Sequence, residues 1–142
     1  MEPRLSLITL GVADLAASTR FYEALGWRRA MKEAQGVAFF QLGPIALSLY
    51  PMADLCRDAA RPAGTRPAFG GITLAHNVRE RDQVDAAVAQ WTAAGGTVVR
   101  TPYATDWGGY IAYVADPDGH LWEIAWNPAF PIDETGRIAM PD

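Results

Sequence analysis

The sequence has a single cysteine in 142 residues, and features that define several broad protein classes are also missing. Cys56 has no second cysteine with which to form an internal disulfide, which disfavours a disulfide-stabilised secreted domain. No apolar run reaches the length of about 18 residues that a membrane-spanning helix needs. The N-terminus has no charged stretch followed by a long apolar one, so we expect no secretory signal. These absences predict a soluble cytoplasmic protein without a membrane partner.

Positive charge is also scarce, with 12 lysines and arginines against 16 acidic residues and a net charge of -4. Nucleic-acid binding needs a basic surface, so we expect no nucleic-acid partner. Apolar residues, in contrast, make up 50% of the chain. A chain of this size buries roughly two-thirds of its unfolded surface, which is enough for a core. We therefore expect one domain over residues 1–142.

The first half of the chain predicts a strand, a helix and three further strands. Ile8, Leu10 and Val12 alternate with other residues, which is typical of a half-buried strand. Asp14 is a good N-cap for the helix that follows, and Gly26 is a natural residue to end it. Strands are then expected at residues 27–31, 37–42 and 45–50, separated by glycine-containing turns.

The second half predicts the same order of elements. A strand at 72–78 precedes a helix at about 80–94, in which Val84, Val88 and Trp91 recur at helical spacing. Strands follow at 97–100, 110–115 and 121–126. The prediction is an α+β fold of two tandem βαβββ modules, at about 5–50 and 70–127, in which each module completes the open sheet of the other.

Two segments lie outside this repeat. Residues 51–69 hold several prolines and arginines, and we expect a linker or flap there without a regular element. Residues 128–142 are also rich in proline and predict an extended C-terminal arm, with Phe130 and Ile132 as its anchors.

A turn of sequence Asp-Pro-Asp-Gly at 116–119 leads into the apolar strand at 121–126, which carries Glu123 near its middle. A carboxylate in a strand is costly to bury unless it faces a polar pocket, a cation or a metal. Alternation puts Leu121, Glu123 and Ala125 on one face of the strand, and Trp122 and Ile124 on the core face. Glu123 therefore either lines a functional cavity or lies at an edge in water.

The doubled βαβββ pattern, the opening segment 7–26 and the turn before Glu123 together resemble the vicinal oxygen chelate superfamily. This superfamily includes glyoxalase I, bleomycin resistance proteins and extradiol dioxygenases. The resemblance covers residues 5–127 and implies a single glyoxalase-like domain whose modules form a cup-shaped mixed sheet with helices outside. It also implies a homodimer and a divalent metal held by His, Gln or Glu side chains from the first and last strand of each module.

Carried over position by position, the family's ligand pattern fits this sequence poorly. The first-strand positions fall on Leu7 and Thr73, and the last strand of the first module offers Leu47 or Ser48. Glu123 is the one matching ligand. We therefore expect no bound metal and no cofactor, and a complete metal site remains the alternative. His76 is expected to lie on the opposite side of its strand, under the helix, as a hydrogen-bonded structural residue.

Several residues are candidates to line a ligand cavity beside Glu123. Trp107 and Tyr110 flank two glycines and offer flat aromatic surfaces. The same role is predicted for Tyr50 at a strand end, and for Thr73 and Asn77 on the strand that alternation places beside Glu123. Glu123 itself is a candidate general base or cation-binding group, or else a carboxylate satisfied by a neighbouring hydroxyl or arginine.

These observations leave three functions open. The first is a small-molecule-binding protein, similar to bleomycin resistance proteins, with an incomplete metal site. The second is a metal-dependent lyase, isomerase or dioxygenase of the same superfamily. The third is a non-catalytic subunit whose cup has become packed core. The sequence does not decide whether the protein is an enzyme, and it does not identify the ligand.

Overall fold

The computed structural model describes residues 5–60 and 70–138, and the chain divides into two units at Gly70–Gly71. Each unit has its own four-stranded mixed sheet, and the two sheets have the same strand topology. The predicted α+β fold with two βαβββ modules is therefore confirmed. Among the described residues, no helix has the length and apolar character needed to cross a membrane.

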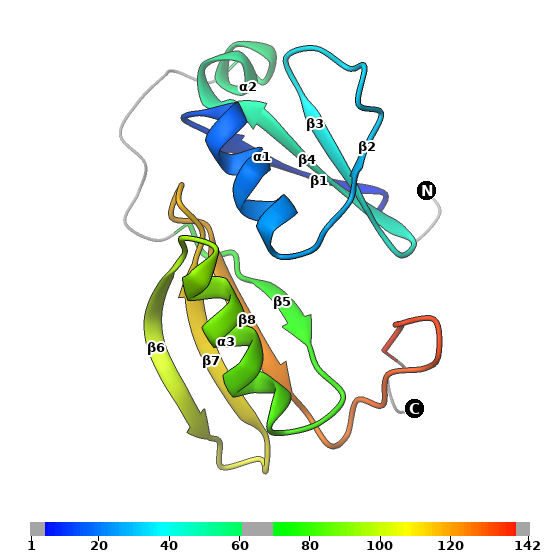
Figure 1. Ribbon diagram of the computed structural model, residues 1–142, viewed down its shortest axis with the longest axis vertical. Helices are drawn as coiled ribbons and strands as arrows, with labels where there is room; N and C mark the ends of the chain where they lie inside the picture. The colour runs from blue at the N-terminus through cyan, green and yellow to red at the C-terminus, as the bar shows by residue number, and fades with distance from the viewer. Residues whose placement is uncertain (1–4, 61–69, 139–142) are drawn as a thin grey trace. The chain divides into compact units, whose positions relative to one another are not determined.

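The first unit contains four strands and two helices, coloured blue to green-cyan in Figure 1. Strand β1 is parallel to β4, and β4 and β3 are antiparallel neighbours, as are β3 and β2, which gives the order β1-β4-β3-β2. The elements are β1 (Leu7–Val12), α1 (Leu15–Ala24), β2 (Arg29–Ala30), β3 (Ala38–Leu42), β4 (Ile45–Pro51) and α2 (Met52–Asp58).

Helix α1 begins where the sequence predicts. The Asp14 carboxylate accepts a hydrogen bond from the backbone N–H of Ala17 at 2.9 Å, which satisfies one of the free donors of the first turn. Gly26 follows the helix with φ of +87°, a conformation that glycine adopts without strain. The helix buries Tyr22, which stacks on Trp27 and contacts Phe40 of β3. These aromatic contacts form the core of the first unit.

Helix α2 corrects the prediction of a linker or flap over 51–69. Its seven residues contact β1 and β4, and residues 61–69 lie outside the described residues. Gly11 of β1 lies under this helix, because a Cβ there would come within 2.6 Å of Met52 Cε and 3.1 Å of a Leu55 methyl carbon. The short helix is thus held by tertiary contacts with β1 and β4, including close packing of the Met52 and Leu55 side chains on Gly11.

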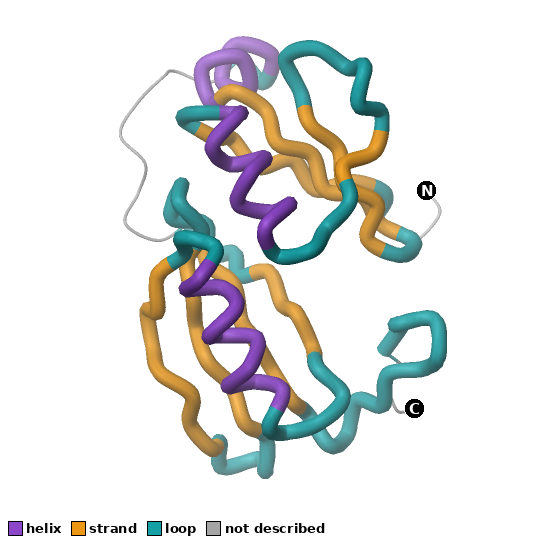
Figure 2. The backbone as a smooth tube through the Cα atoms, in the orientation of Figure 1, coloured by secondary structure: helices purple, strands orange, loops and turns teal. Residues whose placement is uncertain are grey.

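The second unit repeats the arrangement with the order β5-β8-β7-β6, in which β5 is parallel to β8. Helix α3 packs across β6, β7 and β8, and Figure 2 shows it in purple along the sheet of its own unit. Its elements are β5 (Leu74–Asn77), α3 (Gln83–Ala93), β6 (Thr97–Ala104), β7 (Tyr110–Ala115) and β8 (Leu121–Trp126). Strand β6 is longer than the predicted 97–100, and β5 is shorter than the predicted 72–78.

The core of the second unit lies between α3 and one face of its sheet. Val84, Val88 and Trp91 of the helix are buried, as the helical spacing predicts. Trp91 contacts the ring of Trp122 at a centroid distance of 5.6 Å, and its indole N–H donates to the carbonyl of Ala115 at 2.9 Å. Because Trp122 faces α3, its neighbour Glu123 must face the other side of the sheet.

The C-terminal segment differs from the predicted extended arm over its described part. Ile132 forms an isolated bridge with Ile138, and the carboxylate of Asp133 accepts hydrogen bonds from the backbone N–H groups of Thr135 and Arg137. The guanidinium of Arg79 donates to the carbonyls of Ile132 and Asp133 and so ties this turn to the second unit. The described part of the segment is a folded turn. It is stable because the Asp133 carboxylate satisfies backbone N–H groups that water would satisfy in an extended arm.

Candidate functional site

The Asp-Pro-Asp-Gly turn connects β7 to β8 and fixes the position of Glu123. Asp116 is only 4% exposed, and its Oδ1 accepts hydrogen bonds from the backbone N–H groups of Asp118 at 3.0 Å and His120 at 2.8 Å. Gly119 takes the φ of +79° that closes the turn. Because the Asp116 carboxylate fixes the conformation of the turn, it also fixes the register of β7 and β8. Each β8 side chain therefore stays on its own face of the sheet.

Tyr113 is the direct cross-strand partner of Glu123. Its hydroxyl donates a hydrogen bond of 2.7 Å to Glu123 Oε2, and both residues are half-buried. This hydrogen bond, with the partial burial and the charge of the carboxylate, raises the pKa of Tyr113 to about 12. Tyr113 is therefore a neutral donor at physiological pH, and it satisfies one oxygen of the carboxylate.

The sequence analysis missed Tyr113, although the sequence carries a signal for it. Residues 110–115 and 121–126 are predicted strands joined by a short turn, so they form an antiparallel hairpin. Counting outward from the turn places Tyr113 opposite Glu123, on the face that alternation assigns to the carboxylate. One of the predicted alternatives for Glu123 is a carboxylate satisfied by a neighbouring hydroxyl. The Tyr113 hydroxyl is such a neighbour.

Two further side chains reach this face because β6 contains two register shifts. Arg100 pairs with Tyr113 and Tyr103 pairs with Ile111, and the register shifts once before Arg100 and once between these two residues. Each shift is an extra residue that turns the following side chain to the other face of the sheet. In a regular strand, residues three apart would lie on opposite faces, but here Arg100 and Tyr103 lie on the same one.

Arg100 and Tyr103 are in direct contact. The guanidinium carbon of Arg100 lies 3.5 Å from the centroid of the Tyr103 ring, and Nη1 donates to the Tyr103 hydroxyl at 2.9 Å. The register then gives a row across three strands, with Glu123 on β8, Tyr113 on β7 and Arg100 on β6. We call this surface the Glu123 face, defined by Glu123, Tyr113, Arg100 and Tyr103.

The Glu123 face offers a negative charge at one end and a positive charge at the other. Ala75 is the β5 neighbour of Glu123, and its small side chain leaves the carboxylate uncovered on that side. Among the described residues, Glu123 accepts no hydrogen bond other than the one from Tyr113, so Oε1 can accept one from a ligand. Tyr113 lies between the two charged residues in this row, and its ring provides flat apolar surface.

Tyr110 and Trp107 are not brought to the Glu123 face as a pair. Tyr110 lies on the α3 side, where Arg81 stacks over its ring at 3.9 Å and its hydroxyl donates to Asp85 at 3.3 Å. Trp107 is 55% exposed in the β6–β7 connection, and its ring covers the backbone of Gly109, where a Cβ would come within 1.9 Å of the ring. The structure therefore separates Tyr110 from the carboxylate that it was predicted to accompany.

Thr73 and Asn77 are placed at the two ends of β5. Thr73 precedes the strand and is exposed, and Asn77 pairs with Ala125, two residues beyond Glu123 on the neighbouring strand. Asn77 also lines a groove of about 500 Å³ between β5, α3 and the C-terminal turn, together with His76, Arg79 and Gln83. His76 and Asn77 are thus the β5 residues beside this groove, which is large enough for a small ligand.

His76 lies on the α3 side of β5, as alternation predicts, but it is exposed and does not lie buried under the helix. Protein atoms packed around the ring still exclude part of the water, and this burial lowers the pKa of His76 below its usual value. The expectation of a histidine buried under the helix is therefore wrong, because β5 is an edge strand and α3 packs mainly on β6, β7 and β8.

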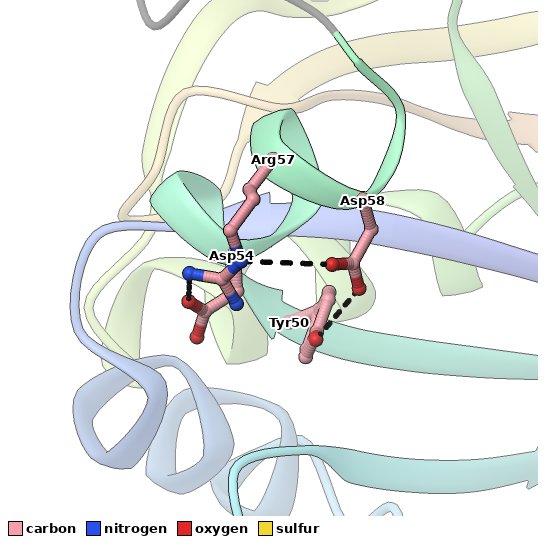
Figure 3. A network of polar contacts seen from close by, with 4 residues as sticks. All are labelled: Tyr50, Asp54, Arg57 and Asp58. Atoms are coloured by element: carbon pink, nitrogen blue, oxygen red, sulfur yellow. Dashed lines mark hydrogen bonds and ion pairs between the residues drawn. The ribbon is translucent and has the colours of Figure 1, made fainter.

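Tyr50 belongs to the first unit and forms part of a polar network with α2 (Figure 3). Its hydroxyl donates to Asp58 Oδ2 at 2.9 Å, and this hydrogen bond is the main reason why the pKa of Tyr50 is raised. Arg57 pairs with Asp54 at 2.8 Å and lies 3.8 Å from Asp58. Tyr50 thus links the end of β4 to the short helix, a structural role that sequence analysis did not predict.

The described residues do not fit the metal that the fold family implies. No group of three His, Cys, Asp or Glu side chains is close enough to bind an ion in residues 5–60 and 70–138. Leu7 offers no donor, Leu47 is buried in the core of the first unit, and the Ser48 hydroxyl is hydrogen-bonded to Thr9 at 2.7 Å. A carboxylate with aliphatic and hydroxyl side chains is not the nitrogen and carboxylate ligand set that catalytic zinc or iron requires.

Comparison with known proteins supports the fold and its family. The model of the Glyoxalase/Bleomycin resistance protein/Dioxygenase superfamily matches residues 4–124. A crystal structure of a glyoxalase-related enzyme from Fulvimarina pelagi is 38% identical, with a TM-score of 0.90 over 99% of this chain and 100% of that one. A hypothetical protein from S. aureus is 27% identical, with a TM-score of 0.77 over 89% of this chain and 95% of that one.

A family enzyme from Burkholderia phytofirmans has the same fold at 20% identity, with a TM-score of 0.76 over 85% of this chain and 96% of that one. The family match covers most of the chain, and the two four-stranded mixed sheets with their three helices agree with the fold of the neighbours. The chain therefore belongs to the Glyoxalase/Bleomycin resistance protein/Dioxygenase superfamily.

Proposed function

We propose that the protein binds a small organic molecule on the Glu123 face, without the help of a metal ion. The observation that carries this proposal is the hydrogen bond between Tyr113 and Glu123 Oε2. It orients the carboxylate and leaves its second oxygen to accept a hydrogen bond from a ligand. A ligand with an amine or another strong donor therefore matches this site.

The burial and contacts of the two residues support this proposal. A half-buried carboxylate without a cationic partner costs free energy unless something compensates its charge. Tyr113 supplies one neutral hydrogen bond, which compensates part of that cost. A bound ammonium group would supply the rest, and a charge-assisted hydrogen bond of this kind contributes about 1.5–3 kcal/mol.

Proton transfer is a second candidate function, favoured by the same open oxygen. Glu123 Oε1 is positioned to accept a proton from a bound substrate, as a general base does. This candidate needs no change in the binding site, because the substrate would occupy the place of the ligand. Proton transfer predicts that the protein turns over a substrate and that Glu123→Gln abolishes this turnover. Binding alone predicts no turnover in either protein.

The test is a titration of the isotope-labelled protein with benzylamine, followed by NMR. The expected result is a set of chemical-shift changes centred on β7 and β8, with affinity reduced by about tenfold or more in Glu123→Gln. Tyr113→Phe should weaken binding, since the carboxylate loses the donor that orients it. Tyr110→Phe is the matched control, because that hydroxyl also donates to a carboxylate but lies on the α3 side.

A metal titration separates this proposal from a metal-dependent lyase, isomerase or dioxygenase. Nickel, zinc, manganese and iron should leave the melting temperature unchanged, since a bound ion would stabilise the folded protein. Stabilisation by one of these ions that is lost in Glu123→Gln, together with no response to benzylamine, would overturn the proposal. An unchanged benzylamine affinity in Glu123→Gln would overturn it as well.

A further inference from the structure

Arg100 is the charged side chain at the end of the row that starts at Glu123, and three observations show that it is held in place there. Its guanidinium lies over the Tyr103 ring, it donates a hydrogen bond to the Tyr103 hydroxyl, and two register shifts in β6 bring both residues to the Glu123 face. We propose that Arg100, held by Tyr103, binds the carboxylate of a ligand whose amine is bound by Glu123. This inference rests on the proposed function and names its ligand class.

The guanidinium of Arg100 retains the donors that such a role needs. Within residues 5–60 and 70–138, no carboxylate lies within ion-pair distance of it, and one of its five N–H groups is used by Tyr103. The Nε–H and Nη2–H edge is left for two parallel hydrogen bonds to a carboxylate. Stacking on an aromatic ring fixes the plane of the guanidinium and so lowers the entropy lost on binding.

The strand spacing sets the size of the ligand. Glu123 and Arg100 are two strands apart, and neighbouring strands are about 4.8 Å apart, so their backbone positions are separated by roughly 9.6 Å. Glu123 accepts a hydrogen bond from Tyr113 and the Arg100 guanidinium lies over the Tyr103 ring, so we expect the charges of the ligand to be separated by a distance of this order. A single aromatic ring with an aminomethyl group and a carboxylate at opposite ends matches that separation.

The arrangement on the other side of the sheet shows why the Glu123 face is different. Arg81 and Tyr110 also form a stacked pair, but the Tyr110 hydroxyl is bonded to Asp85, the acidic residue four positions after Arg81. That carboxylate is already part of the protein, so an anionic ligand would be repelled there. Among the residues that the structure describes, Arg100 has no such carboxylate beside it, and a ligand can supply one.

The experiment compares three probes on the wild-type protein by NMR titration: 4-(aminomethyl)benzoate, benzylamine and benzoate. We expect the first to bind about tenfold more tightly than benzylamine, because its carboxylate adds a bidentate contact with Arg100. The Arg100→Lys variant should reduce its affinity to that of benzylamine and leave benzylamine binding unchanged. The Arg81→Lys variant is the matched control and should change neither affinity.

The outcomes separate this inference from the function on which it rests. Equal affinities for 4-(aminomethyl)benzoate and benzylamine in the wild-type protein would overturn the role of Arg100 and leave Glu123 as the ligand-binding residue. Failure of both compounds to bind would overturn both proposals. The wild-type comparison needs no folded variant, so a destabilised Arg100→Lys protein cannot obscure the result.

Discussion

Replacing Glu123 by glutamine should lower the pKa of its hydrogen-bond partner Tyr113. The Glu123 carboxylate accepts the Tyr113 hydrogen bond and raises the pKa of Tyr113 to about 12, against an ordinary value of about 10. Glutamine keeps an acceptor oxygen but removes the negative charge that opposes the phenolate. We therefore expect the pKa of Tyr113 to fall by about one unit or more in Glu123→Gln.

The assay is a pH titration of protein carrying 13C at the tyrosine ring carbon bonded to oxygen. Tyr113→Phe identifies the resonance, and Tyr103→Phe serves as a control for a neighbour on the same face. An ordinary tyrosine pKa for Tyr113 in the wild-type protein would refute the reasoning, since the hydrogen bond could not then be formed in solution. An unchanged pKa in Glu123→Gln would show that burial, and not the carboxylate, raises it.

The same pair predicts how folding stability depends on pH. The pKa of Tyr113 is higher in the folded than in the unfolded chain, so its stabilising contribution is complete below pH 10 and is lost as the pH rises through 12. A shift of two units corresponds to about 2.7 kcal/mol at full weight, but Tyr113 is partly solvated and screening reduces this to about 1 kcal/mol. Urea denaturation of the wild type and Glu123→Gln at pH 9 and 11.5 would measure it.

Two further predictions concern the scaffold that positions this pair. Gly96→Ala should destabilise the protein by about 3 kcal/mol in urea denaturation, because the new Cβ would lie 2.2 Å from Trp91 Nε1 and break its hydrogen bond to Ala115. Gly70→Ala, with no atom within 4 Å of its Cβ, is the control, and equal stability of the two variants would contradict this packing. Asp116→Ala should cost about 2 kcal/mol by the same assay, since two backbone N–H groups lose their acceptor. Wild-type stability of Asp116→Ala would show that water replaces the carboxylate.

The features that local sequence patterns encode were predicted from the sequence. The alternation before Val12, the cap at Asp14 and the helical spacing from Val84 to Trp91 are short-range signals, and each element forms in the structure. The prediction placed Glu123 and Trp122 on opposite faces for the same reason, because alternation along a strand is local.

The features that depend on tertiary contacts were not predicted. Helix α2 has seven residues, too few for a periodic signal, and its packing on Gly11 stabilises it. The sequence predicts that strand β6 ends at Arg100, and Pro102, which follows, cannot donate a ladder hydrogen bond. The strand continues to Ala104 because it is an edge strand whose register shifts accommodate the proline. Alternation without those shifts would assign Arg100 and Tyr103 to opposite faces.

Strand β6 lies at the edge of its sheet, so the side chains that it presents on the Glu123 face can change without changing the pairing of the other strands. Insertion of a single residue between Arg100 and Tyr103 would move Tyr103 one position along the ladder and turn it to the other face, while β5, β7 and β8 kept their pairing. Insertions and deletions in this strand are therefore a route by which relatives with the same architecture can acquire different ligand preferences.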